Sequence, residues 1–230
     1  MATKKQSTEA ASAAPKSAKK KSSPVVDGYL FFYNAVSAIL WAAVLGRVLL
    51  TNYLQGPEFV PSVVMDFARW TQTLAGLEIL HVALGLVRTS LITTAMQVGS
   101  RYLLVWGVVW LFPSVATSPG YSSMLSAWAT TEVIRYTYFA LLLAGVDAPG
   151  LAWLRYSTFI VLYPVGILSE CWMMWLAATS RAEVTHPLLP TVYYIILFVV
   201  YPPGSVHMYS HMWKQRSKVL SKAKNHEKAN

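Results

Sequence analysis

Cysteine is almost absent from this chain, and charged residues are scarce. The one cysteine among 230 residues, Cys171, lies inside an apolar run, which excludes a disulfide scaffold. Asp, Glu, Lys and Arg make up 13% of the residues, against about a quarter in a typical soluble domain. Hydrophobic residues make up 55%. This composition excludes an ordinary water-soluble globule and indicates a membrane protein.

The basic residues gather at the two ends of the chain. Six of the 19 Lys and Arg lie in residues 1–21 and six in 214–228, whereas the stretch 28–213 holds seven Arg and seven acids. The net charge of +9 therefore belongs to the ends, and this excludes a basic nucleic-acid-binding face on the folded part. We expect a disordered Lys-rich tail over 1–26, a membrane domain over 27–213 and a basic tail over 214–230.

Long apolar stretches fill the middle of the chain. A helix that crosses a bilayer needs about 20 mostly apolar residues, and six stretches qualify: 28–50, 66–88, 98–117, 123–146, 156–178 and 188–210. The sequence thus predicts an all-α polytopic membrane protein with six transmembrane helices in one bundle. An even number of spans puts both Lys-rich ends on one side, which the positive-inside rule assigns to the cytosol.

Four charged side chains lie inside these predicted spans: Glu78, Glu132, Arg135 and Glu170. A charge at mid-membrane costs about 2.5–3.5 kcal/mol on insertion scales. We therefore expect each of the four to have a partner or a function.

A polar stripe runs along the fourth predicted span. Trp128, Glu132, Arg135 and Phe139 follow at spacings of four, three and four, which places them on one face of a helix, with Tyr136 beside it. One interpretation is an ion pair between Glu132 and Arg135 within the helix. The other is that Arg135 faces a cavity, where it binds an anion or shifts the pKa of a neighbouring group. The two interpretations are compatible.

Two residues of the second span have a metal-ligand spacing. Glu78 and His81 form Glu-x-x-His, the pair used in di-iron helical bundles. Those sites need a second such pair, and the spans supply none. We therefore expect no metal, and a structural histidine is the preferred interpretation.

The fifth span holds a phenol and a carboxyl seven residues apart, Tyr163 and Glu170. Seven residues rise about 10 Å along a helix, and Pro164 and Gly166 between them permit a bend. The structural alternative is that Tyr163 serves packing and Glu170 pairs with an Arg. A carboxyl this deep, without a base in its own helix, is expected to exchange a proton near neutral pH.

Four segments resemble a known family, the very-long-chain (3R)-3-hydroxyacyl-CoA dehydratases of fatty-acid elongation, once called protein tyrosine phosphatase-like proteins. They are LEILH (77–81), Gln97 with Arg101, WATTEVIRYTYF (128–139) and LRYSTFIVLYPVGILSE (154–170). The resemblance covers about residues 27 to 213. The family pattern Y-P-x-G-x-x-x-E falls on Tyr163, Pro164, Gly166 and Glu170.

The resemblance implies an enzyme of the endoplasmic-reticulum membrane that converts (3R)-3-hydroxyacyl-CoA into trans-2-enoyl-CoA, without a cofactor, with its site reached from the cytosol. It implies Tyr163 and Glu170 as the catalytic pair, with either group able to take the C2 proton. It also implies partners, namely the condensing enzyme and the two reductases of elongation. The supporting residues are Glu78, Gln97, Arg101, Arg135, Arg155 and Gly166, and we add Tyr136 from its place beside the polar stripe.

Two arginines are candidates for contact with the substrate. Arg101 and Arg155 lie at predicted span ends, where they would meet the CoA phosphates. The acyl chain would lie between spans.

The alternatives are a non-catalytic membrane scaffold or adaptor with the same fold, and a small transporter. Either alternative predicts that function survives loss of the Tyr163 hydroxyl.

Overall fold

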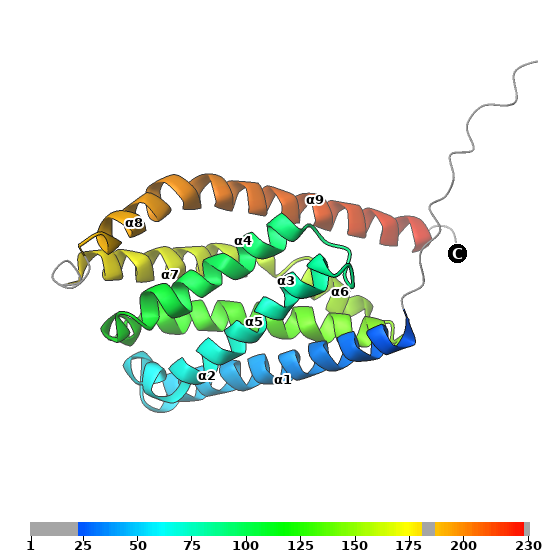
Figure 1. The fold of residues 1–230 in the computed structure, drawn as a ribbon. Coiled ribbons are helices and arrows are strands. Elements are labelled where there is room, and N and C mark those ends of the chain that lie inside the picture. The colour runs from blue at the N-terminus through cyan, green and yellow to red at the C-terminus, as the bar shows by residue number, and fades with distance from the viewer. Residues whose placement is uncertain (1–22, 181–186, 228–230) are drawn as a thin grey trace, which may run out of the picture.

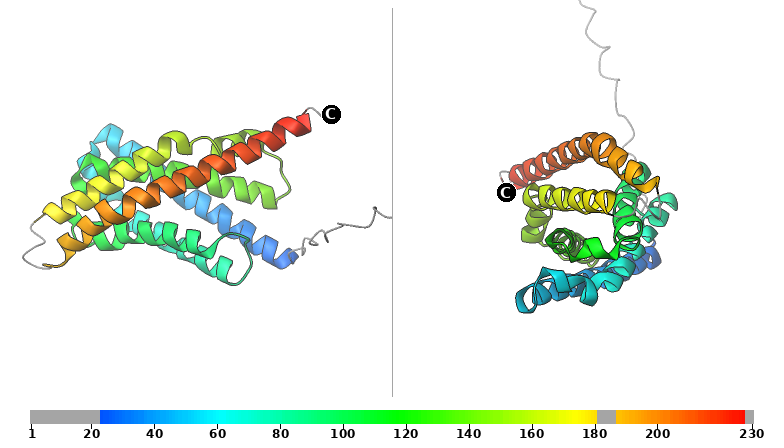
Figure 2. Two further views of the ribbon diagram at one scale, coloured as in Figure 1. Left: turned by 90° about the horizontal axis from the view of Figure 1, so that it is seen from above. Right: turned by 90° about the vertical axis from the view of Figure 1, so that its left-hand side faces the viewer.

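Two layers of helices make up the described chain, residues 23–180 and 187–227 of a computed structural model (Figure 1). One layer is a row of α1 (Pro24–Leu54), α5 (Pro119–Leu143), α7 (Phe159–Thr179) and the rod formed by α8 (Leu189–Ile195), η5 (Ile196–Val200) and α9 (Tyr201–Glu227). The second layer holds α2 (Val60–Leu74), α3 (Gly76–Ala83), α4 (Leu91–Tyr102) and the π-helix η2 (Leu103–Val109), along one side of the row (Figure 2). The described residues contain no strand, so the predicted all-α fold is confirmed.

Short elements connect these helices. They are η1 (Pro57–Phe59), η3 (Pro113–Thr117) and α6 (Pro149–Arg155). Three segments are long and apolar enough to cross a membrane, Pro24–Leu54, Pro149–Thr179 and Leu189–Val219. The chain is thus a membrane protein, and the count of six spans remains a prediction. α1 begins and α9 ends at the same end of the bundle, as an even number of spans requires (Figure 1).

Serine, proline and glycine set the helix ends. The Ser118 hydroxyl accepts a hydrogen bond from the Gly120 N–H at the start of α5, and Pro119 occupies the first turn, where its missing N–H costs nothing. Gly85 and Gly145 close α3 and α5 with φ of 71° and 74°. Only glycine adopts this left-handed conformation freely, so both turns depend on it.

α5 is the central helix of the row. It packs against α1 on one side and α7 on the other. Trp41 of α1, Met124 of α5 and Met173 of α7 are fully buried between these helices. Burial of such side chains contributes about 1.5–3 kcal/mol each, and it fixes the polar stripe of α5 against α7.

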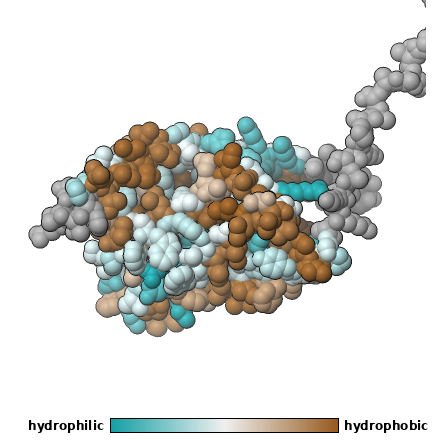
Figure 3. Space-filling model, viewed as in Figure 1, coloured by the Kyte–Doolittle hydropathy of each residue, from teal (hydrophilic) through white to brown (hydrophobic). Residues whose placement is uncertain are grey.

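The outer surface of the bundle is apolar as well. Leu50 on α1, Leu168 on α7 and Phe198 on η5 expose more than half of their surface, and broad hydrophobic areas cover the face drawn in Figure 3. Apolar patches of this extent mark contact with lipid or partners. In a chain with membrane-spanning helices, they face the hydrocarbon.

The ends of the membrane domain differ in detail from the expectation. α1 begins at Pro24, before the predicted boundary at residue 27, and α9 stays helical to Glu227. Lys, Arg, Gln and Ala are good helix formers, so the predicted basic tail continues the last helix. Residues 1–22 and 228–230 of the predicted tails lie outside the described residues, and the division into tails and domain remains a prediction.

The fifth predicted span contains a helix break ahead of Tyr163, and the bend that Pro164 and Gly166 permit remains a prediction. α7 is continuous through Pro164, whereas the chain leaves the helix at Tyr156–Thr158, between α6 and α7. The Ser157 and Thr158 N–H groups both donate to the Leu154 carbonyl there, which forms a tight turn. Pro164 lies inside α7, where its missing N–H removes one helical hydrogen bond, and the neighbouring helices of a membrane bundle make such a proline tolerable.

Candidate active site

Glu132 of α5 is the centre of a buried ion network. Its side chain is 1% exposed. The Arg135 Nε donates to Glu132 Oε2 at 2.6 Å, and the Arg101 Nη1 of α4 donates to Glu132 Oε1. The predicted pair within the helix is confirmed, and a second arginine from another helix joins it.

Glu78 of α3 completes this network. Two guanidinium nitrogens of Arg135 donate to its two oxygens, at 2.9 Å and 2.6 Å, and the Tyr136 hydroxyl donates to Oε1. Two Arg and two Glu thus form a neutral cluster across three helices. Arg135 engages both carboxylates and also lines the cavity described next, so anion binding by Arg135 remains a prediction.

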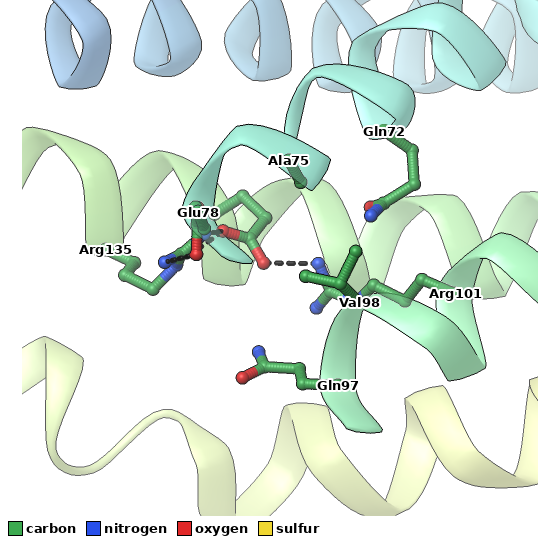
Figure 4. A pocket seen from close by; sticks show the side chains of 8 residues that line it. Gln72, Ala75, Glu78, Gln97, Val98, Arg101 and Arg135 are labelled. Carbon is green, nitrogen blue, oxygen red and sulfur yellow. Dashed lines mark hydrogen bonds and ion pairs between the residues drawn. The ribbon is translucent and has the colours of Figure 1, made fainter. Parts of the chain in front are cut away.

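A small polar cavity borders the network (Figure 4). Its volume is about 10 Å³, room for at most one water. Gln97 of α4 lines it, as does Gln72 of α2, whose amide atoms have no hydrogen-bond partner in the described chain. Sequence reasoning missed Gln72, although a glutamine inside a predicted span was a signal for it.

Glu170 of α7 has a different kind of environment. It is buried. The indole Nε1 of Trp128 donates to its Oε1 at 2.8 Å, and the Tyr201 hydroxyl of α9 donates to its Oε2 at 2.8 Å. Neutral donors thus hold both oxygens. Trp128 comes from the predicted stripe, whereas Tyr201 was missed because no spacing connects it to Glu170.

Tyr163 lies against the next turn of α9. Its hydroxyl donates to the Ser205 carbonyl at 3.4 Å, and its ring lies 5.9 Å from that of Tyr209. Ser205 follows Tyr201 by four residues, about 6 Å along a helix. Tyr163 and Glu170 therefore lie on the same side of α7, where both contact α9.

Trp128 connects the two groups of residues. The Arg101 guanidinium lies 5.0 Å from the centroid of the Trp128 ring, whose N–H binds Glu170. The ion network and the Tyr163–Glu170 region are thus adjacent across one aromatic ring. The stripe of α5 faces both.

Arg101 and Arg155 differ in their hydrogen-bond partners. Arg101 binds Glu132 inside the bundle, so it does not lie free at a helix end as expected. Arg155 ends α6 and lies 4.1 Å from the Phe139 ring centroid, and its Nε and Nη1 have no hydrogen-bond partner in the described chain. Both of these nitrogens are buried, so contact of Arg155 with an anion remains a prediction.

Gly166 lies in α7 between Tyr163 and Glu170 and faces α5. An added Cβ there would lie 3.8 Å from the Cβ of Ala127, an ordinary van der Waals distance. A methyl group would fit, whereas a larger side chain would push the two helices apart. The approach of α7 to α5 therefore requires a small residue at position 166 and does not depend on glycine itself.

His81 is held by aromatic side chains of α1, as expected of a histidine with a structural role. Its Nε2 lies 2.8 Å from the Tyr29 hydroxyl of α1, and its ring packs edge-on against Tyr33. Within residues 23–180 and 187–227, no three His, Cys, Asp or Glu side chains gather in a way that would hold a metal ion.

An apolar groove lies on the outer side of α7. Its volume is about 360 Å³, within the range of ligand pockets. Leu168, Cys171 and Trp175 of α7 line it, together with Leu197 and Phe198 of η5. Cys171 is the residue after Glu170 in the chain, and Glu170 itself is not among the residues that line the groove.

Known proteins similar to this chain are dehydratases. A family model described as "Protein tyrosine phosphatase-like protein, PTPLA" matches residues 72–222. A probable very-long-chain (3R)-3-hydroxyacyl-CoA dehydratase of Schizosaccharomyces pombe is 42% identical over 197 residues, which cover 85% of this chain and 94% of the relative.

Relatives from a plant and an animal are also named as very-long-chain (3R)-3-hydroxyacyl-CoA dehydratases. The dehydratase PASTICCINO 2A of Oryza sativa is 40% identical and covers 85% of this chain and 94% of its own length. Dehydratase 2 of Homo sapiens is 32% identical, over 89% of this chain and 85% of its own length. No solved structure matches. The chain belongs to the protein tyrosine phosphatase-like (PTPLA) family of very-long-chain (3R)-3-hydroxyacyl-CoA dehydratases.

Proposed function

We propose that this protein removes water from (3R)-3-hydroxyacyl-CoA to give trans-2-enoyl-CoA, with Tyr163 and Glu170 as the acid–base pair. The observation that carries the proposal is the buried Glu170 carboxyl, bound only by neutral donors, on the same side of α7 as the Tyr163 hydroxyl. The similarity to named dehydratases supports the reaction. We propose further that the reaction serves the third step of very-long-chain fatty-acid elongation.

The chemistry needs one base and one acid. The base removes the C2 proton, and the electron pair of that C–H bond forms the C2–C3 double bond. The C3–O bond breaks, and the leaving hydroxyl takes a proton from the acid and departs as water. A carboxyl and a phenol supply both functions, and either fits either role.

The CoA part carries phosphates and stays in water, so its contacts belong at the end of the bundle. Arg155 lies there with two unpartnered nitrogens, and Arg216 of α9 is held nearby by Ser157, with its Nε 3.4 Å from the Ser157 hydroxyl. Guanidinium groups suit phosphate recognition. We propose these two residues as contacts of the CoA phosphates.

The acyl chain needs an apolar path from the same site. The apolar groove lined by α7 and η5, which includes Cys171, the chain neighbour of Glu170, is the candidate for this path. Each buried CH₂ contributes about 0.8 kcal/mol, so a long chain gains strongly from such a path. We propose that the acyl chain lies in this groove.

We place the protein in the endoplasmic-reticulum membrane, with the site reached from the cytosol, and the condensing enzyme and two reductases of elongation as partners. The resemblance to the family supports this placement. The common end of α1 and α9, next to the Lys and Arg of the last helix, supports a cytosolic site.

Two single-group variants test the proposal. Glu170→Gln and Tyr163→Phe should each lower kcat for purified protein acting on a long-chain 3-hydroxyacyl-CoA by about 10²–10⁴-fold. Both variants keep the size of the side chain, so both should elute as the folded protein in detergent. Retained turnover in either one contradicts the assignment and favours a scaffold.

A further inference from the structure

The Glu170 carboxyl is held by two donors of different chemistry. We propose that Trp128 and Tyr201 are positioning residues that give its two oxygens separate roles, with Oε1 a permanent acceptor and Oε2 the oxygen that takes up and returns the proton. This inference rests on the proposed function, because it assigns parts to a carboxyl that works as an acid or a base.

The Trp128 side fixes the role of Oε1. An indole N–H donates a hydrogen bond and cannot accept one. The Trp128 Nε1 lies 2.8 Å from Oε1, and both side chains are buried. A protonated carboxyl oxygen is a poorer acceptor than a carbonyl oxygen, so a proton on Oε1 would weaken this bond. Oε1 is therefore the acceptor in both protonation states of the carboxyl.

The Tyr201 side fixes the role of Oε2. A phenol hydroxyl can donate or accept, and that of Tyr201 lies 2.8 Å from Oε2. When the carboxyl is ionised, Tyr201 donates its hydrogen to Oε2. When Oε2 carries a proton, it donates to the Tyr201 oxygen instead, and the phenol hydrogen turns to another acceptor. Tyr201 thus stays bonded to Oε2 in either state.

The placement of Tyr201 directs Oε2 toward the second catalytic group. Ser205, which accepts the hydrogen bond of Tyr163, lies one turn further along α9 on the same side. The proton-carrying oxygen therefore faces the helix against which Tyr163 lies. Trp128 holds the other oxygen toward α5 and Arg101.

Two variants that remove one donor each test the inference in the purified full-length protein. Tyr201→Phe should lower kcat for a long-chain 3-hydroxyacyl-CoA by about 10–100-fold, since a hydrogen bond to a charged group is lost. Trp128→Phe should lower kcat by about 10-fold. KM should change by less than about threefold in both, because neither residue is proposed to bind substrate.

Matched controls lose a hydrogen bond of the same kind elsewhere. Tyr193→Phe removes a hydroxyl on the same rod that donates to the Gly107 carbonyl. Trp106→Phe removes an indole N–H that lies 3.1 Å from the Thr73 hydroxyl. Both controls should melt at a lower temperature and keep kcat within about twofold.

A variant whose carboxyl is already displaced separates a positioning role of Tyr201 from a role in general packing. Glu170→Asp shortens the side chain by one methylene and withdraws the carboxyl from both donors. Tyr201→Phe added to Glu170→Asp should lower kcat by less than about threefold, whereas a purely structural role gives the same loss in both backgrounds. Because Tyr201→Phe removes a single oxygen atom, it decides the matter even if the Trp128 variant does not fold.

The outcomes distinguish this inference from the proposed function. If Tyr201→Phe and Trp128→Phe keep wild-type kcat while Glu170→Gln is inactive, the inference is overturned and the acid–base pair stands. An equal loss from Tyr201→Phe in the wild-type and Glu170→Asp backgrounds also overturns it. Retained turnover in Glu170→Gln overturns the proposed function itself.

Discussion

Glu132 of α5 and Glu170 of α7 are both buried carboxyls, and their partners differ. Glu132 binds two guanidinium groups, those of Arg101 and Arg135, whereas Glu170 binds an indole and a phenol, both neutral. A carboxylate between two cations stabilises the fold as a permanent ion. A carboxylate held by neutral donors can take up and release a proton. The comparison teaches that the partners of a buried acid, more than its depth, indicate its role.

The largest effect should come from combining the two proposed catalytic changes. Groups that act as one unit do not give multiplied losses. We expect the double variant Tyr163→Phe/Glu170→Gln to lose about the same 10²–10⁴-fold in kcat as the worse single variant. Single-turnover assays of the four proteins measure this. Losses that multiply would mean that the two groups act independently.

Substitutions in the ion network around Glu132 should lower the stability of the fold. Glu132→Gln leaves two buried cations short of a counter-charge, a change that costs about 3–5 kcal/mol for a buried pair. Glu78→Gln should cost less, because the Glu78 side chain is 18% exposed and water can reach it. Thermal unfolding of both variants in detergent checks this order. Equal melting temperatures would contradict the network.

A substitution in the apolar groove along α7 tests where the acyl chain lies, through a comparison of substrates with long and short chains. Leu168→Trp adds bulk at a groove residue whose surface is 69% exposed, so folding should not suffer. We expect kcat/KM to fall about tenfold for a long acyl chain, from the loss of about two buried CH₂ contacts, and little for a short one. A uniform loss over all chain lengths would place the chain elsewhere.

The smallest effect should come from the proposed CoA contact. Arg155→Gln removes a cation that has two unpartnered nitrogens. We expect KM to rise by about tenfold, as for one lost charge-assisted hydrogen bond, with kcat unchanged. An acyl-pantetheine substrate, which lacks the nucleotide phosphates, is the control, since the variant should treat it like the wild type does. A loss confined to kcat would move Arg155 into the chemistry.

The sequence predicted the helices because their cause is local. Long apolar runs specify α1, α5 and α7 with little help from the rest of the chain, and a Ser-Pro pair begins both α1 and α5. The helix break before α7 was not predicted, because the turn at Ser157–Thr158 has no strong sequence signal.

The site was predictable in part for the same reason. The Glu132–Arg135 pair is local in sequence, three residues apart, and so it could be predicted from spacing. The partners Arg101 and Tyr201 are 31 residues from Glu132 and Glu170, and helix packing alone brings them together. Spacing within one helix carries no information on such contacts, which is why Tyr201 and Gln72 were missed.

The most direct test of the difference between Glu132 and Glu170 replaces each carboxyl by an amide. Glu170→Gln and Glu132→Gln are purified side by side, and kcat on a long-chain 3-hydroxyacyl-CoA and the melting temperature are measured for each. We expect Glu170→Gln to lose turnover by at least about 100-fold with little change in melting temperature, and Glu132→Gln to lose mainly melting temperature. A Glu170→Gln protein that melts early but turns over normally would contradict the account.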